Sequence, residues 1–380
     1  MHLSRRTTLL GLGALTLSAC ATTTTTTSRT STGLAADLRP TPNAAYDAWV
    51  ASFRGRAAAA GISQSTLDAA FRGTGYLPGV VRRDRNQTEF SRTLEDYLSI
   101  AASDERVSKG RAAFARHRST LNAVEARYGV PANIVTAIWG LESFYGERRG
   151  DVPVISATST LAFDGRRGAF FEKQLIEALR ILQSGDVSPA KLTGSWAGAM
   201  GHTQFIPTSY QSFAVDFTGD GRRDIWSDDP SDSLASTAAY LDRNGWTSGV
   251  DWGREVTGGT SSGTIIQPQP GGPRFAVTSN FRVIKRYNNS DSYAIGVGHL
   301  ADRIVGGGPL RGTFPPDRYG LTKDDRIALQ RRLTARGFDI GGTDGVLGTK
   351  SRAAITAYQT GQGLPATGEP SVALLRALGG

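Results

Sequence analysis

A run of glycine and proline near residue 310 most constrains how this chain can fold. Residues 306–309 read Gly-Gly-Gly-Pro, and residues 315–316 are both proline. Such a run interrupts helices and strands, because proline lacks a backbone donor and glycine loses the most conformational freedom on folding. We therefore expect a large domain over residues 44–310 and a small domain over residues 321–380, joined by a linker over residues 311–320.

Both predicted domains have helical spacing of apolar residues. The stretch from residue 44 to about residue 128 is rich in Ala, Leu, Arg and Glu, and glycines divide it into several helices. Residues 249–281 turn to Gly, Thr, Ser and Pro with short β-prone runs, which predicts loops with a small hairpin. The expected fold class is mainly α, or α+β with little β. Further helices are predicted over residues 131–145, 169–183, 234–244 and 293–304.

The first 20 residues have the pattern of an export signal. Arg5 and Arg6 precede an apolar run over residues 9–17, and Ser18-Ala19-Cys20 follows. The segment Leu17-Ser18-Ala19-Cys20 resembles the bacterial lipobox, in which the cysteine becomes the lipidated first residue of the mature chain. The alternative is an ordinary secretory signal with an incidental cysteine. Residues 21–43 are rich in Thr and Ser, which predicts a flexible tether.

The lipobox resemblance and the charge bear on location and partners. No aspartate follows Cys20, which implies a lipoprotein anchored to the outer membrane and facing the periplasm. With 43 Lys and Arg against 34 Asp and Glu, the chain has a formal charge of +9 and favours an anionic partner. We expect no nucleic acid, because the leader exports the chain and no nucleic-acid-binding module is recognisable. Since Cys20 is the only cysteine, disulfide frameworks and multi-cysteine metal sites are excluded.

One acidic residue falls on the apolar side of a predicted helix. Pro131 suits the first position of this helix and Gly146 suits its C-terminal cap. At about 100° per residue, Glu142 lies between Ile138 and Val135 on a broad apolar arc. The opposite face, where a surface glutamate would be expected, is formed by Asn133, Thr136, Gly140 and Ser143.

Glu142 therefore points toward the predicted core. Burial raises the pKa of a carboxyl group, because its charged form loses water, and a raised pKa suits a general acid near neutral pH. The alternative is a structural glutamate that is neutralised by Arg148 or Arg149. Helix geometry alone leaves both interpretations open.

Three separated segments resemble the family B lytic murein transglycosylases, periplasmic enzymes that cleave the glycan strands of peptidoglycan. The first is Trp139-Gly140-Leu141-Glu142-Ser143-Phe144-Tyr145-Gly146. The second joins Ser195-Trp196-Ala197-Gly198-Ala199-Met200-Gly201 to Gln204-Phe205-Ile206-Pro207-Thr208-Ser209-Tyr210. The third contains Arg286-Tyr287-Asn288-Asn289-Ser290 and Tyr293-Ala294. The resemblance covers roughly residues 44–306 and implies a lysozyme-like helical catalytic domain.

By this resemblance Glu142 is the catalytic acid. The residues implied to line the glycan groove around it are Ser195, Gln204, Tyr240, Asn288 and Tyr293. The residues themselves are compatible with that role, since small side chains let a sugar approach the backbone and polar groups suit hydroxyls and acetamides. Without the family, a glycine-rich turn before a helix that starts at Pro207, with the polar groups as caps, would be the preferred explanation of the second segment. Nothing in the sequence assigns a catalytic role to His202.

The resemblance also implies a mechanism that uses a single acid. A hydrolase of the usual design needs two carboxyl groups, and the sequence offers no convincing partner for Glu142. In the family one glutamate protonates the glycosidic oxygen and then deprotonates the muramyl 6-hydroxyl, which gives a 1,6-anhydro product. The competing hypotheses are a hydrolytic muramidase on the same substrate and a non-catalytic wall-binding lipoprotein. We expect no required cofactor and a monomeric protein.

A short acidic segment has half of a calcium-binding motif. Asp216, Thr218 and Asp220 supply oxygens at positions 1, 3 and 5 of an EF-hand-like loop, Gly221 follows at position 6 and the Arg222 carbonyl at position 7. Position 12 lacks the usual glutamate, and some family members close a longer ring with a later aspartate. Asp232 is our candidate for that closing ligand of a structural Ca²⁺. A metal-free Asp-Gly turn is the equal alternative.

The segment from residue 321 to residue 380 closely resembles the peptidoglycan-binding domain 1 family, which implies a three-helix unit. The matching strings include Ala328-Leu329-Gln330-Arg331-Arg332-Leu333, Asp344-Gly345-Val346-Leu347-Gly348 and Gly363-Leu364-Pro365-Ala366-Thr367-Gly368. The implied partners are peptidoglycan glycan strands, a membrane through the lipid anchor and other wall-remodelling enzymes. A folded cap without a ligand is the alternative for this segment.

Overall fold

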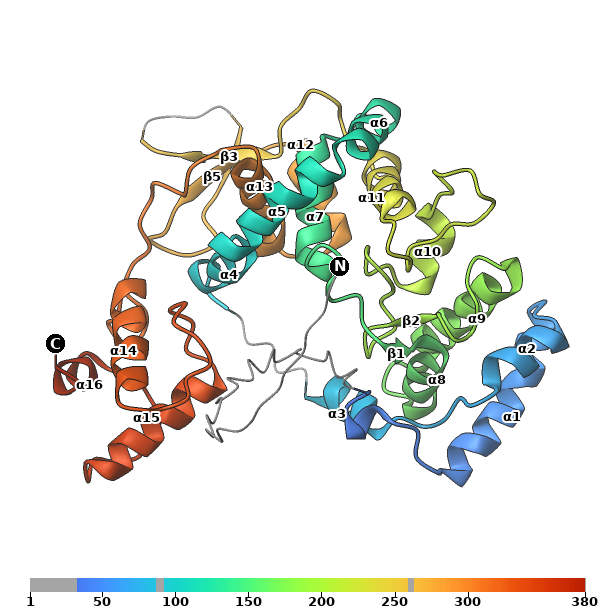
Figure 1. The fold of residues 1–380 in the computed structure, drawn as a ribbon, viewed down its shortest axis with the longest axis horizontal. Helices are drawn as coiled ribbons and strands as arrows, with labels where there is room; N and C mark the ends of the chain where they lie inside the picture. Colours follow the sequence, from blue (N-terminus) through green and yellow to red (C-terminus); the bar gives the residue numbers. More distant parts are fainter. Residues whose placement is uncertain (1–32, 87–91, 259–262, 380) are drawn as a thin grey trace, which may run out of the picture.

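The computed structural model describes residues 33–86, 92–258 and 263–379. Within them the protein is mainly α with small sheets, which confirms the predicted fold class (Figure 1). The predicted signal peptide, Cys20 and the tether before residue 33 lie outside the described residues. In the described ranges, no helix combines the length and the apolar character needed to cross a membrane.

The alanine-rich stretch forms several helices, as predicted. They are α1 (Ala44–Ala59), α2 (Gln64–Phe71), α3 (Pro78–Arg85), α4 (Leu94–Ala101), α5 (Asp104–Arg116) and α6 (Arg118–Tyr128). Polar N-caps fix where several of them begin, because Asn43, Ser63, Thr93 and Ser103 each accept a hydrogen bond from a backbone N–H in the first turn.

The predicted tether is wrong for its last part. Residues 36–38 form a short 3₁₀ helix, and Leu38 is buried in an apolar cluster. Asp37 accepts hydrogen bonds from both Arg82 and Arg83 on α3. Apolar contact and ion pairing therefore hold residues 33–43 against the large domain, and the Thr- and Ser-rich composition of the preceding stretch does not extend to them.

The rest of the large domain contains both predicted and unpredicted elements. The helices expected from periodicity are α7 (Ala132–Ser143), α9 (Gly168–Ser184), α11 (Ser231–Arg243) and α13 (Asp291–Ile304). Those not predicted, or treated only as one alternative, are α8 (Val154–Asp164), α10 (Pro207–Phe213) and α12 (Ser279–Tyr287). Helix α8 was not predicted from apolar periodicity, because it is buried on nearly every side and its sequence has no polar stripe.

Residues 249–281 form more strand than the small hairpin that we expected. The strands β3 (Gly253–Val256), β5 (Arg274–Val277) and β4 (Thr264–Ile266) make an antiparallel sheet in the order β3-β5-β4. A second, smaller pair joins β1 (Val152–Pro153) to β2 (Thr193–Gly194). Phe275 of β5 is fully buried, and the sheet packs on the same core as α7 and α13.

Two apolar cores meet inside the large domain. One surrounds α7 and α13, and the other surrounds α8 and α9 together with α1 and α2 (Figure 1). Tyr240 and Tyr287 pack against both cores. Among the candidate functional residues, Tyr240 therefore lies at the junction of the two cores.

The environment of α7 differs from the expectation. We expected Thr136, Gly140 and Ser143 on a solvent-facing side, but all three are buried. Helices α5, α6, α11 and α13 all pack against α7, so the helix is enclosed rather than half exposed. Its end also comes earlier than residue 145, because Phe144 and Tyr145 adopt left-handed backbone conformations with φ of 52° and 59°.

The C-terminal domain has the predicted three helices and its own core. These are α14 (Lys323–Ala335), α15 (Thr349–Gly361) and α16 (Val372–Ala377), which lie at one end of the molecule (Figure 1). The predicted linker is docked on the large domain, because Phe314 packs against the α7–α13 core and the Arg311 and Gly312 N–H groups donate to Glu255.

Candidate active site

Glu142 lies in the last turn of α7, where the chain leaves the helix abruptly. Left-handed Phe144 and Tyr145 are followed by Gly146, whose φ is 87°. Tyr145 folds back so that its ring covers Gly140, where a Cβ atom would come within 2.6 Å of the ring. This tight return keeps the end of α7 fixed, and the side chain of Glu142 stays partly exposed among otherwise buried neighbours.

A tyrosine from another helix holds the carboxylate. Tyr293 lies in the first turn of α13, and its hydroxyl donates a hydrogen bond to Glu142 Oε1 over 2.6 Å. Helices α7 and α13 pack together along their lengths. The structure therefore brings together two residues that are 151 positions apart in sequence and that the family resemblance assigned to one site.

The environment of Glu142 favours its protonated form. Burial raises the pKa of Glu142 to about 7, although the Tyr293 hydrogen bond acts in the opposite direction. The two arginines proposed as neutralising partners are engaged elsewhere. Arg149 pairs with Asp228 at 2.8 Å, and the Arg148 guanidinium stacks over the Phe144 ring at 4.4 Å. The interpretation of Glu142 as a salt-bridged structural residue therefore loses the partners on which it depended.

Two further tyrosines, Tyr97 and Tyr287, interact electrostatically with Glu142, and sequence reasoning assigned neither of them to the site. Burial, with a smaller contribution from the Glu142 charge, raises the pKa of Tyr97 on α4 to about 12. The same two causes raise the pKa of Tyr287 and Tyr293 well above the ordinary value. All three therefore stay protonated and remain hydrogen-bond donors. Tyr287 belongs to the third segment that resembles the transglycosylase family. Tyr97 lies in a predicted helix that contains no recognisable motif.

The glycine-rich segment after β2 is tied to the end of α7 by side-chain bonds. Ser143 Oγ donates to the His202 carbonyl at 2.9 Å, and Gln204 Nε2 donates to the Arg149 carbonyl at 3.0 Å. Gln204 itself has a left-handed φ of 52°. These bonds hold residues 195–206 beside the helix end that carries Glu142.

His202 has a structural role that the sequence did not reveal. Trp139 Nε1 donates to His202 Nδ1 at 3.0 Å, so the imidazole proton is on Nε2, which lies 2.7 Å from the Ser227 carbonyl. Burial lowers the pKa of His202 to about 4, and the ring is therefore neutral at pH 7. His202 therefore links α7, through Trp139, to the acidic loop over residues 216–232, through Ser227.

The other residues implied to line the groove have different surroundings. Ser195 Oγ accepts hydrogen bonds from the Ala197 and Ala199 N–H groups, which shapes its own turn. The Tyr240 hydroxyl donates to the Arg286 carbonyl at 2.5 Å, and its ring packs 4.7 Å from that of Tyr287. Asn288 is exposed at the end of α12. Of the five implied residues, Tyr293 forms a hydrogen bond with Glu142, and Tyr240 packs against Tyr287.

The predicted calcium loop gathers its carboxylates. One oxygen from each of Asp216, Asp220 and Asp232 lies within 4.8 Å of the others. Asp216 accepts hydrogen bonds from the Gly219 and Gly221 N–H groups, and Asp232 accepts them from Phe217, Thr218 and Asp224. Thr218 Oγ1 lies 3.4 Å from Asp216 Oδ1, and the Arg222 N–H donates to Asp220. Hard oxygen donors at this spacing fit a Ca²⁺ ion, although the backbone bonds also satisfy a metal-free turn.

Comparisons with known proteins agree with this architecture. Residues 45–263 and 257–302 match the family described as transglycosylase SLT domain, and residues 322–378 match a putative peptidoglycan binding domain. Membrane-bound lytic murein transglycosylase B of Escherichia coli strain K12 is 31% identical over 224 residues, which are 50% of this chain and 61% of that protein. The chain thus spans less than two thirds of this relative's length.

Solved structures are also similar. SltB3 from Pseudomonas aeruginosa, crystallised in complex with NAG-anhNAM-pentapeptide, is 44% identical and has a TM-score of 0.70, over 88% of this chain and all of that one. Slt35 from Escherichia coli, in complex with calcium, is 27% identical with a TM-score of 0.59, over 69% of this chain and 93% of that one.

Proposed function

Because this chain belongs to the transglycosylase SLT domain family, we propose that it is a peptidoglycan lytic transglycosylase. It cleaves the β-1,4 bond between MurNAc and GlcNAc without water and leaves 1,6-anhydroMurNAc ends. The observation that carries the proposal is Glu142, a partly exposed acid whose pKa is raised by burial to about 7 and whose hydrogen bond comes from a neutral tyrosine. Such a group can both give and take a proton near neutral pH.

The reaction uses Glu142 twice. The protonated carboxyl first donates its proton to the glycosidic oxygen, and the bond from that oxygen to C1 of the muramyl sugar breaks. The carboxylate then removes the proton of the 6-hydroxyl while O6 bonds to C1, which restores the protonated acid. Tyr293 keeps Oε1 oriented through both steps because its hydroxyl donates to that atom. The 6-hydroxyl competes well with solvent, since it is already tethered close to C1.

A hydrolytic muramidase is the second candidate, and it would need another carboxylate to activate water. The two acids that we would consider first are already occupied. Asp164 pairs with Arg85 at 2.5 Å, and Asp216 accepts hydrogen bonds from its own loop. The complex of the relative SltB3 with an anhydro-sugar ligand also supports the transglycosylase assignment. A non-catalytic wall-binding lipoprotein would have no need of an unpaired acid in this position.

The remaining assignments follow from the same proposal. Ser195, Gln204, Tyr240 and Asn288 contact the glycan in the groove beside Glu142, and the C-terminal domain attaches the enzyme to peptidoglycan. Cys20 carries a lipid that anchors the protein to the outer membrane on its periplasmic side. The protein acts as a monomer, works beside other wall-remodelling enzymes and binds no nucleic acid.

We also propose a structural calcium ion, with catalysis requiring no cofactor. Asp216, Asp220 and Asp232 would hold it by carboxylate oxygens, with Thr218 and the Arg222 carbonyl completing the loop. The ion would offset the repulsion between the three acids and so stabilise the fold near α11. The calcium complex of Slt35 supports this assignment.

The test of the catalytic proposal is the release of soluble fragments from purified sacculi. Glu142→Gln keeps the shape of the side chain but removes its proton chemistry, and we expect it to lower the rate by about 10²–10⁴-fold. Glu147→Gln is the matched control, since Glu147 is an exposed partner of Lys109 on the same segment. A folded Glu142→Gln variant with near wild-type release would contradict the proposal.

A further inference from the structure

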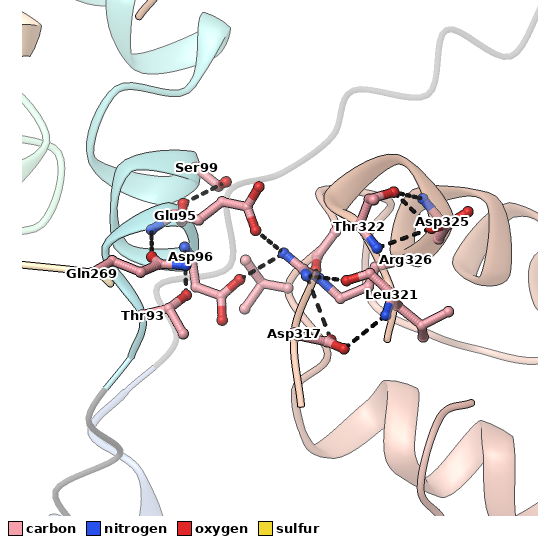
Figure 2. Close-up of polar contacts among 12 residues, drawn as sticks. Thr93, Glu95, Asp96, Ser99, Gln269, Asp317, Leu321, Thr322, Asp325 and Arg326 are labelled. Carbon is pink, nitrogen blue, oxygen red and sulfur yellow. Dashed lines mark hydrogen bonds and ion pairs between the residues drawn. The ribbon is translucent and has the colours of Figure 1, made fainter. Parts of the chain in front are cut away.

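A buried arginine joins the C-terminal domain to the large domain. The Arg326 side chain on α14 is only 5% exposed, and its Nη2 lies 2.6 Å from Glu95 Oε2 and 3.1 Å from Asp96 Oδ1 on α4 (Figure 2). Its Nη1 lies 3.5 Å from Asp317 Oδ2 in the linker, and its Nε donates to the Gly345 carbonyl. Both domains and the linker therefore meet at one guanidinium group, which fixes the shape of the seam between them.

A cavity of about 570 Å³ lies at this seam. Its charged lining comprises Arg92, Arg318, Arg326 and Arg352 against Asp96 and Asp317. Both carboxylates are within ion-pair distance of Arg326, and Asp317 also acts on Arg318, but the lining still has four cationic side chains against two anionic ones. In the part of the chain that the structure describes, neither Arg92 nor Arg352 has an ion pair with a carboxylate. The cavity is therefore positively charged.

The start of α15 adds a second feature that favours an anion. Gly348 is the N-cap of this helix, and no side chain caps it. Gly348 and Thr349 both line the cavity, so the free N–H groups and the positive end of the helix dipole lie beside its arginines. Val346 and Leu347 contribute an apolar part of the wall. The combination suits a ligand that has several carboxylates together with small apolar side chains.

We propose that this cavity binds the carboxylate-bearing stem peptide of a peptidoglycan strand whose muramyl sugar lies at Glu142. The inference rests on the proposed function, because it assumes that a glycan strand occupies the cleft. It assigns to the seam a role beyond attachment of the C-terminal domain. One substrate would then contact both domains: the large domain would bind its sugar, and the seam between the domains would bind its peptide.

The position of α4 connects the two sites. Arg92, Thr93 and Asp96 line the cavity at the start of this helix, and Tyr97 in its first turn is close enough to Glu142 to sense its charge. The four residue steps from the N-cap Thr93 to Tyr97 correspond to about 6 Å of helix rise. An extended peptide of four or five residues spans about 13–18 Å. An extended stem peptide is therefore longer than the part of α4 that lies between Tyr97 and the cavity.

The experiment is a calorimetric titration of the full chain with a synthetic stem tetrapeptide that carries no sugar. We expect wild type to bind the peptide with free carboxylates, and to bind the same peptide with amidated carboxylates at least tenfold more weakly. The double variant Arg92→Gln with Arg352→Gln should also lose at least tenfold in affinity. Lys350→Gln is the matched control on α15, since Lys350 pairs with Asp339 outside the cavity, and its affinity should equal that of wild type.

Two results would overturn the inference: no binding of the free-carboxylate peptide to wild type, or equal binding by wild type and the double variant when thermal melting shows both folded. Cleavage of peptide-free glycan strands by wild type tests the proposed function separately, because such strands carry nothing for the cavity to bind. Failure of the peptide titration with intact cleavage would remove the inference alone. Failure of that cleavage would remove the proposed function.

Discussion

Glu142 and Arg326 are both largely withdrawn from water, but their surroundings differ. Arg326 has three carboxylates within 3.5 Å, whereas Glu142 has a neutral tyrosine. The bonds to carboxylates outweigh burial and raise the pKa of Arg326, so this cation stays charged. Burial raises the pKa of Glu142, so that acid holds its proton near neutral pH. A buried charge that is paired builds an interface, and one left unpaired becomes available for proton transfer.

The largest effect on stability should come from breaking the paired cluster. Arg326→Met leaves Glu95 and Asp96 partly buried without their cation, and we expect a loss of about 3 kcal/mol in unfolding free energy. Lys350→Met is the control, because its exposed pair with Asp339 should contribute about 0–1 kcal/mol. Denaturant unfolding measures both changes. If both variants lost the same unfolding free energy, the ion pairs of Arg326 would contribute no more to stability than an exposed surface pair.

Removing the unpaired Glu142 charge should increase the free energy of unfolding, which is the opposite of the effect expected for Arg326→Met. Since burial raises the pKa of Glu142 from 4.5 to about 7, the folded state binds more protons than the unfolded state between these values. The contribution of Glu142 to stability therefore falls as pH rises from 4.5 to about 7 and is then constant. Glu142→Gln should stabilise the fold by about 1–3 kcal/mol at pH 8 and have little effect at pH 4. Destabilisation at pH 8 would show that the charged form is compensated after all.

The sequence predicted the unpaired acid but not the paired cation. Helical phase put Glu142 on the apolar side of its helix, and local motifs marked Tyr293 and the glycine-rich segment. Arg326 and Glu95 are 231 positions apart and belong to different domains, so no periodicity or spacing connects them. Tyr97 was missed for the same reason, because its position beside Glu142 depends on how α4 packs against α13. Local patterns predicted the elements, and contacts between distant elements required the structure.

The loop over residues 216–232 is a third case, because within the described residues the carboxylates of Asp216, Asp220 and Asp232 lie close together and accept hydrogen bonds mainly from backbone N–H groups. At a free calcium concentration ten times the Kd, binding should add about 1.4 kcal/mol to the stability of the metal-stripped protein. Thermal melting with and without calcium measures this shift, and Asp216→Ala with Asp220→Ala should abolish it. If calcium does not change the melting temperature of the metal-stripped wild type, the metal-free turn is favoured.

The smallest expected effect is a shift in the pH dependence of activity when Tyr293, which donates a hydrogen bond to Glu142, is replaced. The Tyr293 hydrogen bond lowers the pKa of Glu142, so Tyr293→Phe should raise it further and move the alkaline limb of kcat/KM to higher pH. Tyr128→Phe is the control, since the Tyr128 hydroxyl has no hydrogen-bond partner in the described structure. A limb that moves to lower pH in Tyr293→Phe would contradict the assignment of that bond.

The central claim is that one unpaired acid carries out the reaction without a second carboxylate to activate water. Mass spectrometry of the muropeptides released from purified sacculi tests it most directly. We predict fragments that end in 1,6-anhydroMurNAc, lighter by one water than muramidase products and resistant to borohydride reduction. Fragments with reducing MurNAc ends as the main species would contradict the account, because they require an activated water.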